Sequence, residues 1–158
     1  MKYTGLALVF ASTCFWLSWC LMPGVGVTDT DTIFRLVAAH RDSVFVSVVL
    51  QLVSAAAYAP GIVGIVSASG TQRSAAARIG AALLAVGAMG SAADAIYHLV
   101  AYEMTAPNLP LGTLAPIMRR LQGPDLALLL PFVLAFFAVH VVLVVSRRGH
   151  DSRARTAF

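Results

Sequence analysis

Charge is scarce in this sequence. Asp, Glu, Lys and Arg together make up 11% of the 158 residues, whereas soluble domains have roughly 25%. Hydrophobic residues account for 59%, and several apolar runs are about 20 residues long, which is the length that crosses a bilayer as a helix. These features exclude an ordinary soluble domain and predict an integral membrane protein.

Cysteine is also scarce, and both copies, Cys14 and Cys20, lie in the first apolar run. On one helix they point in different directions, so we expect no disulfide between them and interpret them as apolar thiols. Alternation of basic and aromatic residues, which is typical of nucleic-acid-binding surfaces, is missing as well. We therefore expect a lipid bilayer as the surroundings and no nucleic acid as a partner.

Four apolar runs predict an all-α fold, a four-helix transmembrane bundle built from two hairpins. The expected spans are residues 3–22, 43–66, 79–104 and 125–146, which form one domain (1–146), with a basic cytoplasmic tail at 147–158. Pro60 is expected to kink or end the second span, and Pro131 to bend the fourth. The first run lacks the small residues of a signal-peptide cleavage site, so we expect the mature protein to retain it.

The two long connections each contain a short amphipathic segment. In residues 28–42, good N-cap residues precede a mixture of apolar and polar positions, and residues 114–121 end in Arg119 and Arg120. Both patterns predict short helices on the membrane surface. The side that holds both termini carries seven of the 11 Lys and Arg residues. The positive-inside rule therefore predicts cytoplasmic termini, and we expect a bacterial cytoplasmic (inner) membrane.

Polar residues inside the spans meet at one depth. Asp94 is the only acid well inside an apolar run, and on a helix it shares a face with His98 and Tyr102. Counted inward from the long connections at about 1.5 Å per residue, Ser47 and Gln51 of the second span lie at the same level. The sequence thus predicts a polar cluster in the outer half of the bundle.

His40 and Glu103 are placed at the mouth of this cluster. The complete set of predicted polar-core or ligand-binding residues is Asp94, His98, Tyr102, Ser47, Gln51, His40 and Glu103. Two interpretations stay open at this point. The cluster is either a network that joins helices, at roughly 0.6 to 2 kcal/mol for each contact, or a site for a ligand, proton or ion.

Familiar chemistries fit the spacing poorly. His140 lies roughly 13 Å deeper than His98, which argues against a haem held by both. A zinc site requires His40 to fold back toward Asp94 and His98. A Ser-His-Asp triad through Ser47 lacks a nucleophile-elbow motif. We assign no catalytic or metal-binding residue, and the cofactor is unknown.

Four short stretches carry a resemblance to known proteins: LMP at 21–23, VAAHR at 37–41, APG at 59–61 and RIGAAL at 78–83. They resemble a family of small four-helix bacterial membrane proteins of unknown function, of the DUF4386-like type. The resemblance implies a bacterial inner-membrane protein and supplies no catalytic residue.

The third span carries a stripe of small residues, Gly87, Ser91 and Ala95, which lets another helix approach closely. With no soluble domain and no catalytic motif, this stripe favours a non-catalytic accessory or structural subunit that packs against other membrane subunits or against itself. The first alternative is a protein that binds or transports a lipid, quinone, pigment or other amphiphile in its polar cluster. The second alternative is an intramembrane metal-dependent enzyme.

Overall fold

A computed structural model describes residues 2–68 and 75–123, together with positions 127, 131, 134, 135 and 138. The described part is all-helical. In chain order its helices are α1 (Lys2–Leu21), α2 (Thr30–Ala39), α3 (Arg41–Ala68), α4 (Ala75–Met104) and α5 (Leu111–Gln122). The fourth span predicted at 125–146 and the tail at 147–158 fall almost entirely outside the described residues, so the complete four-helix bundle stays a prediction.

Helices α1, α3 and α4 are long and apolar enough to cross a membrane. Their candidate spans, Tyr3–Leu21, Arg41–Ser67 and Arg78–Met104, coincide with the first three apolar runs of the sequence. The described part is therefore that of an all-helical membrane protein with three candidate spans.

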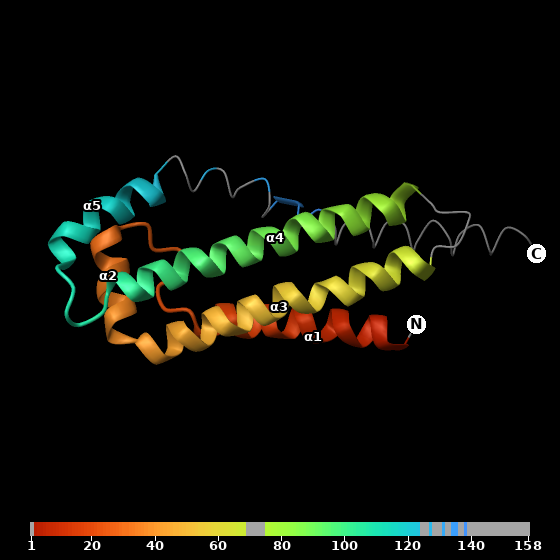
Figure 1. The fold of residues 1–158 in the computed structure, drawn as a ribbon, viewed down its shortest axis with the longest axis horizontal. Helices are drawn as coiled ribbons and strands as arrows, with labels where there is room; N and C mark the ends of the chain where they lie inside the picture. The colour runs from red at the N-terminus through yellow and green to blue at the C-terminus, as the bar shows by residue number, and fades with distance from the viewer. Residues whose placement is uncertain are drawn as a thin grey trace, which may run out of the picture.

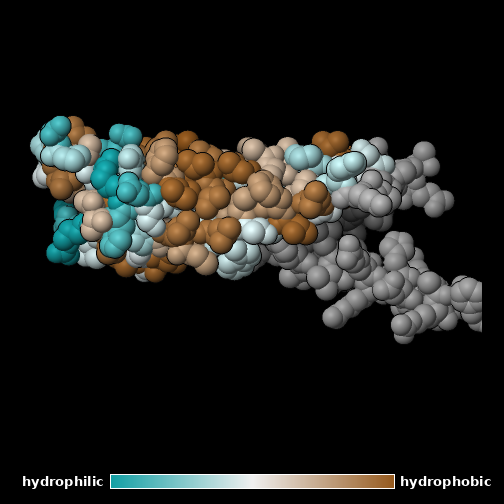
Figure 2. All heavy atoms as spheres, turned by 90° about the horizontal axis from the view of Figure 1, so that it is seen from below, coloured by the Kyte–Doolittle hydropathy of each residue, from teal (hydrophilic) through white to brown (hydrophobic). Residues whose placement is uncertain are grey.

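The long helices run side by side, and α3 packs along both α1 and α4 (Figure 1). The short helices α2 and α5 gather at the end of the bundle opposite the N-terminus, where α4 finishes (Figure 1). We call this the loop end. Hydrophilic residues are concentrated there, and hydrophobic residues cover much of the adjoining shaft (Figure 2).

Local sequence explains where α2 begins. The carboxylate of Asp29 caps the helix by accepting a 2.9 Å hydrogen bond from the backbone N–H of Thr32. Phe34 and Val37 are buried, while Arg35 on the other face is exposed. The amphipathic helix predicted within residues 28–42 is present.

Helix α5 is longer than expected, because it begins at Leu111 and continues through Pro116 to Gln122. A proline inside a helix leaves the carbonyl four residues earlier without its N–H partner. Here that residue is Gly112, which is exposed, so water can satisfy the carbonyl.

Pro60 was expected to kink or end the second span, and the second of these alternatives is wrong, because the helix continues to Ala68. The reason lies in its neighbour. Gly61 and Gly64 bring the α3 backbone directly against the Leu8 and Thr4 side chains of α1. Packing at this close approach offsets the hydrogen bond that Pro60 cannot make.

Serine hydroxyls join α3 to α1 along what we call the α1–α3 seam. The hydroxyl of Ser47 donates to the backbone oxygen of Ser18 at 2.6 Å, and that of Ser54 donates to Ala11 at 2.7 Å. Further along, the hydroxyls of Tyr58 and Ser12 lie 3.2 Å apart. The hydrogen bonds of these polar side chains therefore hold two spans together.

Candidate functional site

The predicted polar cluster forms where α3 meets α4. The Nε2 amide of Gln51 donates to Oδ2 of Asp94 at 2.6 Å. The Nδ1 atom of His98 lies 3.5 Å from the same carboxylate oxygen and 2.9 Å from the backbone oxygen of Asp94. The structure thus brings together Asp94, His98 and Gln51, as the depth count predicts.

One side of this cluster is closed. Ser18, Trp19 and Met22 from α1 and its end, together with Ser47, pack around the Gln51–Asp94 contact. The space between them has no room for a water molecule. On this side the polar residues act as a packed network between helices.

The other side of Asp94 and His98 opens into a cavity of about 270 Å³, which we call the loop-end cavity. The connection 22–28 forms one wall, and Ile33 and Val37 of α2 form another. The α4 wall and the two ends are made by Asp94, Tyr97, His98, Ala101, Trp19 and Gln122. The cavity therefore has mostly apolar walls with polar groups along α4, which is typical of small-molecule sites.

The wall at 22–28 depends on two glycines with positive φ. Gly24 has φ 74° and Gly26 has φ 86°, a region that residues with a Cβ rarely adopt. Gly24 also lies so close to Leu36 of α2 that a Cβ would overlap its side chain. Backbone conformation and close packing together hold this connection over α2.

Tyr97 is a cavity-lining residue that sequence reasoning misses. Its hydroxyl is buried, makes no hydrogen bond of normal geometry within the described part of the chain, and lies near the side chain of Gln122. Its ring packs edge-on against His98, with the ring centroids 5.6 Å apart. Tyr97 is three positions from Asp94, so it also shares that helix face, and this i, i+3 spacing is the signal that the sequence offers.

Three predicted residues lie outside both the polar cluster and the cavity. The ring of Tyr102 packs under the guanidinium of Arg41, which is 3.8 Å from the ring centroid. His40 is exposed at the end of α2, with Nδ1 3.0 Å from the backbone oxygen of Leu36, and Glu103 is exposed. Eight residues of a helix with 3.6 residues per turn rotate Tyr102 by about 80° away from Asp94. The connection 22–28 covers the mouth instead.

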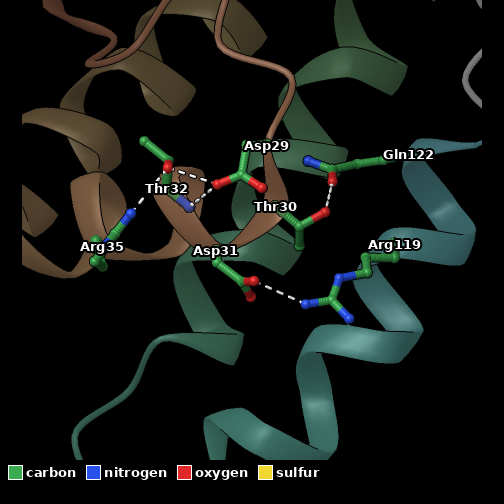
Figure 3. A network of polar contacts seen from close by, with 7 residues as sticks. All are labelled: Asp29, Thr30, Asp31, Thr32, Arg35, Arg119 and Gln122. Carbon is green, nitrogen blue, oxygen red and sulfur yellow. Dashed lines mark hydrogen bonds and ion pairs between the residues drawn. The ribbon is translucent and has the colours of Figure 1, made fainter.

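Helices α2 and α5 form a roof at the loop end (Figure 3). Arg119 donates to Asp31 at 2.8 Å, and the hydroxyl of Thr30 donates to the side-chain oxygen of Gln122. The side-chain and backbone hydrogen bonds that Thr32 donates hold the pKa of Asp29 below its usual value of 3.8. These contacts position Gln122 beside the cavity.

Two of the chemical alternatives, the Ser-His-Asp triad and the zinc site, lack a residue that each requires. The hydroxyl of Ser47 donates to a backbone oxygen of α1, so it is not held against His98 as a nucleophile. His40, the third ligand of the zinc hypothesis, is exposed on α2. In the ranges 2–68 and 75–123, no three His, Cys, Asp or Glu side chains are placed to hold a metal ion.

Comparison of the chain with protein families, with curated proteins and with solved structures finds no match. The resemblance to the DUF4386-like family therefore stays a prediction. The function has to be inferred from the geometry of the loop end.

Proposed function

We propose that this protein binds a small amphiphile in the loop-end cavity. One observation carries the proposal: a cavity of about 270 Å³ with mostly apolar walls lies directly beside the polar side chains of Asp94 and His98. Both side chains are partly exposed, 24% for Asp94 and 21% for His98, so a ligand in the cavity can reach them.

The apolar walls suit the rest of such a ligand. Ile33 and Val37 of α2 and Ala101 of α4 face the cavity, and these groups gain by excluding water from an apolar chain. The polar group then lies along α4 and the chain lies against α2. This division between a polar edge and apolar walls is what favours an amphiphile.

The accessory-subunit hypothesis loses its main support. Gly87, Ser91 and Ala95, the small-residue stripe, are all buried within the chain. Ala95 packs with Val44 and Val48 of α3. The stripe is buried inside the protein, so it is no longer evidence for contact with an external subunit.

We also propose the cellular setting from the distribution of Lys and Arg. That distribution supports a bacterial cytoplasmic membrane with both termini in the cytoplasm. In this orientation the loop end lies at the outer face, and the ligand enters from the outer leaflet or from the space beyond it.

The two tryptophans permit a direct test. Trp19 lines the cavity, whereas Trp16 is 63% exposed on α1. In Trp16→Phe, reconstituted in zwitterionic lipid nanodiscs, ω-bromooctanol should quench Trp19 with a saturable component. In Trp19→Phe, quenching of Trp16 should rise only in proportion to the probe dissolved in the bilayer.

A pair of substitutions distinguishes the cavity from the bilayer. Ile33→Phe fills part of the cavity and should remove the saturable component, whereas Ile117→Phe, at an exposed position of α5 outside the cavity, should preserve it. Quenching of Trp19 that never saturates, or that is the same in both variants, would show that the cavity binds no such molecule.

A further inference from the structure

We propose that the loop-end cavity selects a protonated primary amine, an ammonium group on a short apolar chain. This inference rests on the proposed binding of an amphiphile and identifies the polar group that the site recognises. Four features of the cavity lead to it: the hydrogen bond of His98, the acceptor capacity of Asp94, the position of the nearby arginines and the size of the space.

The hydrogen bond of His98 sets its tautomer. Nδ1 lies 2.9 Å from the backbone oxygen of Asp94, and a carbonyl oxygen can only accept, so Nδ1 carries the proton. In a neutral imidazole the other nitrogen, Nε2, is then an acceptor. His98 therefore offers a lone pair to a ligand that donates.

Asp94 adds further acceptor capacity. Its Oδ2 accepts from Gln51, but Gln51 is neutral and a carboxylate has about four lone-pair sites. Within the described ranges no Lys or Arg lies within 4.0 Å of this carboxylate, and the imidazole of His98 lies 3.5 Å away. A carboxylate charge inside a span is costly without a cationic partner, so a cationic ligand is favoured here.

The arginines at the loop end are engaged elsewhere. The guanidinium of Arg41 lies over the ring of Tyr102 and donates to Thr105 at 3.0 Å. Arg119 is paired with Asp31. No described residue that lines the cavity is Lys or Arg, so a carboxylate or phosphate group finds no matching charge.

Hydrogen-bond balance also separates an amine from a quinone. Quinone oxygens can only accept hydrogen bonds. Asp94 and the unprotonated nitrogen of His98 are also acceptors, so a quinone offers them no donor. An ammonium has three donors, which suit the acceptor atoms of Asp94 and His98. The aromatic rings of Trp19 and Tyr97 also line the cavity, and aromatic faces attract cations.

The volume limits the ligand to a small molecule. A cavity of about 270 Å³ is slightly below the usual range of roughly 300–1,000 Å³ for drug-sized ligands. A complete phospholipid or a long-chain quinone is too large for it. An alkylamine of about octyl length is a suitable probe.

The experiment uses the Trp16→Phe protein in zwitterionic nanodiscs and three probes that differ only in their polar group: ω-bromooctylamine, ω-bromooctanol and ω-bromooctanoate. The Trp19→Phe protein measures how much of each probe enters the bilayer. At equal bilayer content, the amine should half-saturate Trp19 at roughly tenfold to hundredfold lower concentration than the alcohol, as expected for a charge-assisted hydrogen bond. The octanoate should show no saturation.

Asp94→Asn isolates the carboxylate charge, because the asparagine oxygen can still accept from Gln51. This variant should bind the amine no better than the alcohol. Asp42→Asn removes an exposed acid near the same end of the bundle and should leave the amine preference intact. An unchanged Trp19 emission maximum in both variants checks that the site is still folded.

The outcomes separate the two proposals. If alcohol and amine saturate equally, the cavity binds amphiphiles but does not select amines, and this inference is wrong while the proposed function stands. The inference is equally wrong if Asp94→Asn keeps the amine preference or if octanoate binds most tightly. If none of the three probes saturates, the proposed function itself fails.

Discussion

The α1–α3 seam and the loop-end cavity are two polar regions inside one apolar bundle, and they differ in what their polar side chains face. At the seam, Ser47 and Ser54 are buried and each donates to a backbone oxygen of α1. At the cavity, the side chains of Asp94 and His98 are partly exposed and line open space. Polarity inside a span is therefore not enough to indicate a site, whereas polar groups beside open space are.

Backbone geometry explains the difference. At the seam, two helices lie side by side, so serines of α3 reach backbone oxygens of α1. At the loop end, α1 stops at Leu21 and the chain turns through 22–28. This connection lines the cavity together with α4.

The largest expected effect comes from breaking the seam at its closest approach. A Cβ at Gly64 overlaps the short, stiff side chain of Thr4. We expect Gly64→Val to lower the free energy of unfolding by about 1–3 kcal/mol, the usual cost of overpacking. Equilibrium unfolding with SDS in mixed micelles measures this change.

Gly5→Val is the matched control, because a Cβ at Gly5 has no neighbour within 4 Å. It adds the same side chain to the same pair of helices without a clash, so stability should stay close to wild type. Equal losses in the two variants would contradict the close approach at Gly64.

A smaller effect compares two tyrosines directly. Tyr58→Phe removes a hydroxyl that lies 3.2 Å from that of Ser12 and should cost about 0.6–1.7 kcal/mol, the range for hydrogen bonds between membrane helices. Tyr97→Phe removes an unpaired hydroxyl, so stability should be unchanged or higher.

The same SDS unfolding experiment measures both tyrosine variants. A stability loss in Tyr97→Phe as large as that in Tyr58→Phe would remove the distinction between seam and cavity.

The smallest expected effect is the pH dependence of helix α2, which forms the roof of the cavity together with α5. Because hydrogen bonds from Thr32 hold the pKa of Asp29 below 3.8, the ionised cap stabilises α2 fully above that value. This stabilisation is lost as the pH falls through the lower folded-state pKa. Hydrogen-exchange protection of α2 amides, corrected for intrinsic rates, should therefore decline in acid.

Asp29→Asn is the control for the acid effect, because asparagine caps helices without a titrating group. Its α2 protection should change less over the same acid range. A parallel decline in both proteins would mean that another group causes the loss.

Periodicity and helix rise account for the features that could be predicted from residues alone. The spacing of Ser47, Gln51 and Asp94 identifies a shared depth, because every helix advances by the same distance per residue. The Asp29 cap can be predicted equally well, because it depends only on one side chain and the backbone of the next helical turn. The apolar runs predict the three described spans for the same reason.

Features that depend on contacts between segments could not be predicted this way. Pro60 is tolerated in α3 because α1 packs against the glycines that follow it. His40 and Glu103 were assigned to the mouth, but the connection 22–28 covers it, since Gly24 turns that segment onto Leu36 of α2. The spacing of residues in the sequence does not show which of these segments covers the mouth of the cavity.

The sequence alone determines that this is an apolar helical chain with Asp94 and His98 on one face of a span, because composition and helical period are local properties. Tertiary structure decides what those residues face. Gln51 closes one side of Asp94, while the loop end leaves a cavity beside Tyr97 on the other. Only the packing of distant segments determines which polar groups are satisfied and which stay available to a ligand.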